Sequence, residues 1–108
     1  DGLMESLKAA EGQIRRGAIE EKSKSLGRAS KIVLGLQSAL DFEAGGEIAR
    51  NLDELYGYMT RRLLHVNLHN DLEALAEVTS LMSEIQSAWG SIPKMLGEQQ
   101  RPSMRLAS

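Results

Sequence analysis

Proline is absent from the first ninety-two residues of this 108-residue chain, and apolar side chains recur there three or four positions apart. This spacing places apolar groups on one face of an α-helix, and a stretch without proline lets helices run unbroken. Apolar and polar residues nowhere alternate for long enough to predict a β-strand. The sequence therefore predicts an all-α chain.

Three short breaks divide this stretch into four helical segments. They fall at Arg16-Gly17, at 41–46 with its two adjacent glycines, and at 67–70. Glycine adopts backbone angles that a helix excludes, and Asn70 or Asp71 is typical of a helix N-cap. Helices of similar length joined by short connections predict an antiparallel up-down four-helix bundle.

Two domain-level expectations follow from these breaks. We expect the third helix to begin near Glu47 and the fourth to fade at Gly90, so that residues 1–92 form the bundle. Periodicity is lost from Pro93, and we expect residues 93–108 to be a flexible C-terminal tail. Because the chain opens on Asp1 in sequence that is already helix-like, we expect it to lack its natural N-terminus.

Each segment carries an apolar seam that we expect to face the core. The second seam contains one lysine, Lys22, whose ammonium we expect to reach water near the helix end. The four seams are Leu3, Leu7, Ala10 and Ile14; Ile19, Lys22, Leu26, Ala29, Val33, Leu36 and Leu40; Ile48, Leu52, Leu55, Met59, Leu63 and Val66; and Leu72, Leu75, Thr79, Met82, Ile85 and Trp89.

Charge and composition exclude several classes of function. Thirteen Lys and Arg against fifteen Asp and Glu give a net charge of −2, which does not favour nucleic-acid binding. The chain has no cysteine, so disulfides and thiolate metal sites are excluded. No apolar run approaches the roughly 18 residues of a membrane span, and no signal peptide is evident. We therefore expect a cytoplasmic protein that binds neither nucleic acid nor membrane.

The chain shows no pattern typical of catalysis. His65 and His69 are four residues apart, as paired metal ligands can be, but the Glu-x-x-His motif of di-metal bundles is absent. Val66 follows His65, where histidine phosphotransfer domains carry a Lys-Gly pair. Phosphate-binding loops and nucleophile elbows are also absent. We interpret the histidines as helix-end residues and expect no enzyme activity, metal or cofactor.

The apolar surface is wider than four helices need. In the fourth helix it spans an arc on the order of 200°, against a little over 100° for an ordinary bundle helix. An N-terminal segment, a second copy of the chain or a groove for a partner's amphipathic segment would each account for this surplus. From their off-seam positions we expect these residues to contact a partner: Ile32, Leu34, Leu36, Val78, Leu81, Ile85 and Trp89. A charge at Leu34 or Leu81 is expected to abolish partner binding.

The third helix and its flanks carry a specific sequence pattern. Residues 40–52 read LDFEAGGEIARNL and lead into LYGYMTRRLL at 55–64, with Ala88-Trp89 on the last helix. This pattern resembles the flagellin-specific export chaperone family, FliS, over about residues 1–92. The sequence differs from the family pattern at its N-terminus, because the tyrosine-bearing N-terminal segment of the family is absent here.

The resemblance implies a fold and a function. It implies a small antiparallel helical bundle in the bacterial cytosol that binds the disordered C-terminal segment of flagellin, which forms helices against the bundle. Such a chaperone prevents premature polymerisation and keeps flagellin competent for flagellar type III secretion; the export gate and flagellar regulators are further expected partners. The alternative from the residues alone is a generic helical interaction module that forms a homodimer.

Overall fold

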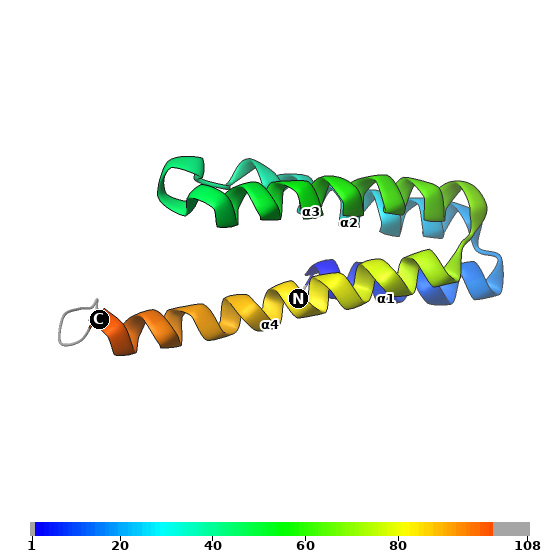
Figure 1. Cartoon of the computed structure of the whole chain (residues 1–108). Coiled ribbons are helices and arrows are strands. Elements are labelled where there is room, and N and C mark those ends of the chain that lie inside the picture. The colour runs from blue at the N-terminus through cyan, green and yellow to red at the C-terminus, as the bar shows by residue number, and fades with distance from the viewer. Residues whose placement is uncertain (1, 101–108) are drawn as a thin grey trace.

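Four helices follow one another along the chain in the computed structural model (Figure 1), which describes the backbone of residues 2–100 and the side chains of residues 2–88. They are α1 (Gly2–Arg16), α2 (Ile19–Ser38), α3 (Phe42–His69) and α4 (Leu72–Gln100). Each helix packs against the next and α4 packs back on α1, which closes a ring of four antiparallel helices. The described residues contain no strand, and the all-α four-helix bundle is confirmed.

The connections form where the residues favour them. Gly17, between α1 and α2, has a φ of +72°, a left-handed conformation that costs glycine little. Between α3 and α4, Asn70 takes the left-handed conformation and its N–H donates to the carbonyl of Val66. Asp71 Oδ1 then accepts from the backbone N–H of Ala74, 3.1 Å away, and so caps α4.

The start of α3 differs in detail from the expectation. Asp41 is its N-cap and accepts from the N–H groups of Glu43 and Ala44, so a first helical turn forms before the glycines. Gly46 then leaves helical geometry (φ +53°, ψ −123°) and kinks the helix, and the regular helix continues from Glu47. The paired glycines therefore interrupt α3 rather than precede it.

A single apolar core runs along the bundle axis. Its most deeply buried large side chains include Leu7 of α1, Val33 of α2, Met59 and Leu63 of α3, and Met82 of α4. Burial of each such side chain contributes roughly 1.5–3 kcal/mol. The predicted seams supply most of these residues, because a spacing of three and four keeps them on one helical face.

Two of the predicted seams turn slightly from their expected faces. On α4, Val78 is buried instead of Thr79, and on α3, Ala49 and Tyr56 join the core. Neighbouring positions on a helix differ by about 100°, but Leu75, Met82 and Ile85 of the predicted seam stay buried, so the buried face of α4 turns by only part of that angle. The residue Ile19 was expected in the core but is exposed, since it begins α2 beyond the packed region.

The fourth helix is longer than expected. Its backbone stays helical past Gly90 and through Pro93 to Gln100, so the expectation that it fades at Gly90 is wrong. Residues 94–100 are mostly good helix formers, which favours continuation despite the backbone N–H that proline lacks. The flexible tail stays a prediction, and residues 101–108 of that tail lie outside the described residues.

Candidate partner-binding site

Within the described residues, α1 is shorter than the two helices it packs against, α2 and α4, and one end of the bundle has no α1 beside it. It begins beside Ile32: a Cβ placed on Gly2 would lie 3.7 Å from the Ile32 Cδ1. The helix α2 continues to Ser38 past this point, and α4 extends well beyond it in the same direction (Figure 1). Within the described residues, the last turns of α2 therefore have no α1 beside them.

Apolar side chains collect at this uncovered end. Leu36 and Leu40 of α2 and Leu52 and Leu55 of α3 are only partly buried where they pack on the core. Ile48 is 65% exposed next to the buried Ala49, so it lies beside the core-facing stripe of α3. It adds an exposed apolar side chain at the edge of that stripe. We call this surface, formed by Leu36, Leu40, Ile48, Leu52 and Leu55, the uncovered end.

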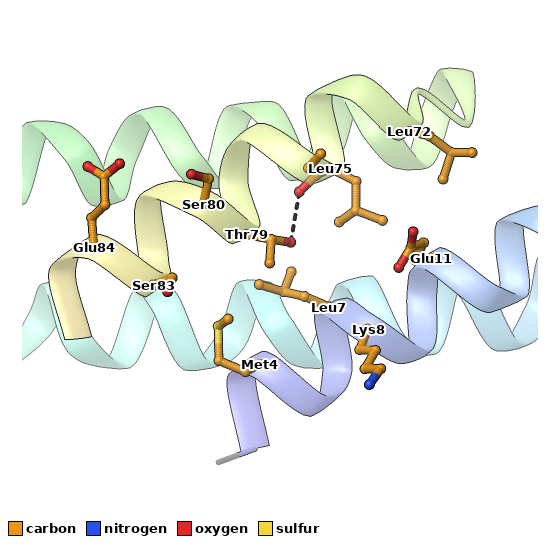
Figure 2. Close-up of a pocket in the computed structure, with 11 residues that line it drawn as sticks. Met4, Leu7, Lys8, Glu11, Leu72, Leu75, Thr79, Ser80, Ser83 and Glu84 are labelled. Carbon is orange, nitrogen blue, oxygen red and sulfur yellow. Dashed lines mark hydrogen bonds between the residues drawn. The ribbon is translucent and has the colours of Figure 1, made fainter. Parts of the chain in front are cut away.

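A groove of about 600 Å³ lies between α1 and α4 and opens to solvent. Leu7 and Leu75 lie across from each other along it, with Met4 at one end and Leu72 at the other (Figure 2). The hydroxyl of Thr79 donates to the carbonyl of Leu75 (2.9 Å), so it is satisfied within its own helix. This α1–α4 groove can therefore accept apolar side chains without leaving that hydroxyl unpaired.

Charged and polar side chains edge the α1–α4 groove. Lys8 and Glu11 lie along α1, and Ser80, Ser83 and Glu84 lie along α4 (Figure 2). An apolar floor with a mixed polar rim suits an amphipathic segment and offers no concentrated charge.

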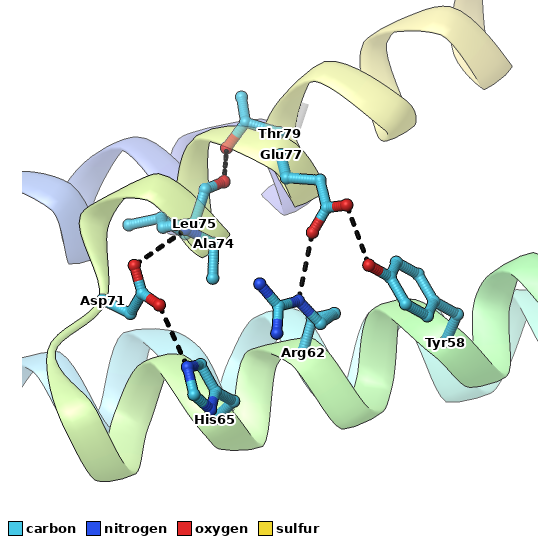
Figure 3. A network of polar contacts seen from close by, with 8 residues as sticks. All are labelled: Tyr58, Arg62, His65, Asp71, Ala74, Leu75, Glu77 and Thr79. Carbon is cyan, nitrogen blue, oxygen red and sulfur yellow. Dashed lines mark hydrogen bonds and ion pairs between the residues drawn. The ribbon is translucent and has the colours of Figure 1, made fainter.

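The opposite flank of α4 is fastened to α3 by polar contacts (Figure 3). Glu77 accepts from the Tyr58 hydroxyl (2.8 Å) and from Arg62 Nε (3.0 Å). The carboxylate of Glu77 raises the pKa of Tyr58 through this hydrogen bond. This side of α4 therefore faces α3, whereas Leu72, Leu75 and Thr79 line the groove toward α1.

The histidines contribute to the α3–α4 corner. His65 Nε2 pairs with Asp71 Oδ2 at 3.0 Å, and the rings of His65 and His69 lie 4.7 Å apart. The backbone N–H of Ala74, followed by His65, lowers the pKa of the Asp71 carboxyl. Within residues 2–88, no three His, Asp or Glu side chains converge as a metal site would require.

Lys22 is the polar residue that sequence reasoning misplaced. It is only 5% exposed, and its ammonium does not point into water as expected. Nζ donates to the backbone carbonyl of Asn67 (2.9 Å) and to Oδ1 of Asn70 (2.7 Å), at the C-terminal end of α3. The last carbonyls of a helix lack intrahelical partners and carry partial negative charge, so a cation is stabilising there. The sequence signal for this buried contact was a lysine within an otherwise apolar seam.

The structure separates the seven residues predicted to contact a partner. Ile32, Leu36 and Leu81 are partly buried against the core and retain some accessible surface. Val78 and Ile85 are core residues, at 1% and 7% exposure, and Val78 is covered by the bundle itself. The side chain of Trp89 lies outside the described residues.

Leu34 lies apart from the other predicted contacts. It is 47% exposed, and it is two positions, or about 200°, from Leu36 on the helix. Leu36 packs on the core, so Leu34 faces away from the uncovered end. Sequence reasoning did not identify Ile48 as a contact because its spacing assigned it to the core.

Within the described residues, no helix is long and apolar enough to cross a membrane.

Comparison with known proteins identifies the family. The family described as Flagellar protein FliS matches residues 1–95. The chain is 46% identical over 91 residues to flagellar secretion chaperone FliSB of Pseudomonas aeruginosa, covering 84% of this chain and 72% of that protein. It is 45% identical over 103 residues to flagellar secretion chaperone FliS of Salmonella typhimurium (94% and 76% covered) and 39% identical over 92 residues to that of Vibrio cholerae (85% and 68%). The chain therefore belongs to the FliS family.

Proposed function

We propose that this protein is a flagellar secretion chaperone that binds the C-terminal segment of flagellin. The segment docks as amphipathic helix in the α1–α4 groove and over the uncovered end. Its apolar residues are then removed from water and from other flagellin subunits, which prevents premature polymerisation and keeps the subunit competent for flagellar type III secretion.

The observation that supports this proposal is the partly exposed apolar surface that adjoins the core at the uncovered end. Ile48 lies next to the buried Ala49 on α3 and is itself 65% exposed. Leaving such a side chain in water gives up roughly 1.5–3 kcal/mol that burial would contribute. A helix laid across the uncovered end would bury Ile48 together with the accessible parts of Leu52 and Leu36.

Several such contacts are needed for binding. A disordered segment that folds on binding loses about 2–5 kcal/mol or more of interaction energy to its own ordering. The groove and the uncovered end offer apolar contacts on three helices, α2, α3 and α4, and on the rim of α1. That many contacts can offset the ordering cost, whereas one anchor could not. Of the residues predicted from the sequence, Leu36 belongs to the uncovered end and Ile32 lies beside the first residue of α1.

The test is a calorimetric and circular-dichroism titration with a peptide of the C-terminal segment of flagellin from the same bacterium. We expect saturable binding with a gain of helix. Ile48→Asp should weaken binding by about tenfold or more, because a buried carboxylate replaces an apolar contact. Ile19→Asp is the matched control, since Ile19 is 66% exposed and lies at the opposite end of α2. Equal affinities of the two variants would refute the uncovered end as the client site.

The remaining parts of the proposal concern the cell. The chaperone acts in the bacterial cytosol, does no catalysis, and passes its client to the export gate, with flagellar regulators as further partners. Sedimentation across a range of concentrations tests the alternative of a homodimer module. A mass that doubles with concentration, with no peptide binding by either technique, would replace the chaperone proposal with that module.

A further inference from the structure

A second groove, of about 310 Å³, lies between α2 and α3. Gly27 and Ser30 line it from α2, and Thr60, Arg61 and Leu64 line it from α3. In the ring of four helices the α2–α3 pair lies on the far side from the α1–α4 pair (Figure 1). The α2–α3 groove is therefore separate from the surface proposed for flagellin.

Exposed leucines border the α2–α3 groove. Leu64, in its wall, is 61% exposed, and Leu68 lies one turn further along α3 at 68%. On α2, Leu34 lies seven residues after Gly27, about two turns along the same face. Single exposed leucines are ordinary, but three along one groove form an apolar strip that a partner helix would bury.

The floor of the groove is open at Gly27. A Cβ built there would meet nothing within 4 Å. Glycine in mid-helix is unfavourable relative to alanine, and here no close neighbour inside the chain requires it. A low floor does allow an external helix to approach the backbone of α2.

The rim of the α2–α3 groove is basic in a chain whose net charge is −2. Lys31 lies four residues after Gly27, so its side chain flanks Gly27 on α2. Lys24 lies on the other flank of α2, in a hollow that Glu5 of α1 also lines. On α3, Arg61 lies over Gly57, with NH1 3.5 Å from where a Cβ of Gly57 would be. The ion pairs of the described residues are Arg15–Glu11, Arg62–Glu77 and His65–Asp71, so they neutralise neither Lys31 nor Arg61.

We propose that the α2–α3 groove binds an acidic amphipathic helix of a second protein, with leucine-like residues against Leu34 and Leu64 and carboxylates against Lys31 and Arg61. A second copy of this chain docking face to face would bring the same cations together, which is repulsive. This binding does not depend on the proposed flagellin site, and the chaperone can hold a client and this partner at once.

The probes are two synthetic peptides of about eighteen residues, or about five helical turns. They share a leucine stripe, and one carries Glu on the flanks where the other carries Lys. We expect the Glu peptide to bind saturably and to shift backbone amide resonances of residues 27, 30, 61 and 64. Added salt should weaken that binding, because partly exposed charges are screened. Equal binding of the two peptides would overturn the proposal.

Two variants locate the binding. Gly27→Gln places a side chain in the open groove, and Leu64→Glu puts a carboxylate among the peptide's own; each should lower affinity by about tenfold or more. Ile19→Gln, with comparable exposure outside the groove, should stay within about twofold. Unchanged affinity in Gly27→Gln, or resonance shifts confined to the α1–α4 groove and the uncovered end, would refute the α2–α3 site.

A last titration tests this inference separately from the proposed function. The Glu peptide is titrated into chaperone already saturated with the flagellin peptide, and its affinity is expected to stay within about twofold. Displacement of one peptide by the other would refute two separate sites. If the flagellin peptide does not bind at all, the Glu-against-Lys comparison on the free protein still decides the present inference.

Discussion

The lysine buried at the α3–α4 corner leads to a prediction in which two effects oppose each other. Lys22 donates two hydrogen bonds to the end of α3 at 2.9 and 2.7 Å, and its side chain crosses the packed interface of α2. Its hydrocarbon stem contributes stability by burial. Its ammonium contributes hydrogen bonds but loses its hydration on folding.

Truncation removes both parts of the side chain. In Lys22→Ala the lost stem is three methylenes at about 0.8 kcal/mol each, or about 2 kcal/mol. The carbonyl of Asn67 loses its donor, which costs about 1 kcal/mol, because Asn67 is half-buried and water can take part of the place. We therefore expect Lys22→Ala to lower the free energy of unfolding by about 2–4 kcal/mol.

Lys22→Met keeps most of the stem and removes the ammonium. The dehydration cost disappears together with the two hydrogen bonds, and Asn70, which is exposed, can bond to water instead. We expect the net change to stay within about 1 kcal/mol. The difference between the two variants thus reports the stem, and the change in Lys22→Met reports the ammonium.

Urea denaturation followed by circular dichroism measures both variants, with Lys24→Ala as the control on the exposed face of α2. The control should change stability by less than about 0.5 kcal/mol. A loss in Lys22→Met as large as in Lys22→Ala would refute the reasoning, because the ammonium bonds would then dominate. No loss in Lys22→Ala would show that the stem contributes nothing.

Three further predictions follow from single residues. Gly46→Ala should destabilise the protein by about 1–3 kcal/mol, because φ is +53° there. Gly27→Ala should stabilise it by up to about 1 kcal/mol, because the added Cβ would meet nothing within 4 Å. Thermal unfolding measures both variants. Tyr56→Phe should raise stability by about 1 kcal/mol in the same assay, since the buried Tyr56 hydroxyl has no hydrogen-bond partner among the described residues. The pKa of Asp71 is lowered, so its contribution to stability is complete above the ordinary carboxyl pKa of 3.8 and is lost as pH falls through the lower, folded-state value. Asp71→Ala should therefore make the free energy of unfolding from urea denaturation depend less on pH in that acidic range. His65→Ala loses the same ion pair and should reduce the pH dependence in the same direction.

Much of the fold was predictable because the information for it is local. Leu26, Ala29 and Val33 repeat at three and four, and each is buried as that spacing predicts. The turn at Gly17 and the helix cap at Asp71 were also predictable from the sequence. The turn depends on the conformational preference of one glycine, and the cap depends on one side-chain oxygen.

The errors fall where a residue's environment depends on another helix. The register of α4, with Val78 inward instead of Thr79, depends on how α4 packs on α3, and contacts between these helices join distant residues: Glu77 lies nineteen positions from Tyr58 and fifteen from Arg62. The destination of Lys22 depends on the end of α3, more than forty positions away. Periodicity reports which residues share a face but not what covers that face.

Two isoleucines of equal exposure show what this limit means for the candidate site. Ile19 and Ile48 are 66% and 65% exposed, and spacing assigned both to the core. Ile19 begins a helix, where a terminal turn can extend past its neighbours at little cost. Ile48 lies inside α3, between the Gly46 kink and the buried Met59, and adjoins the partly buried Leu52 of the uncovered end. A partner helix across the uncovered end would bury Ile48 together with the accessible parts of Leu52 and Leu55, so the proposed client site includes Ile48 and not Ile19.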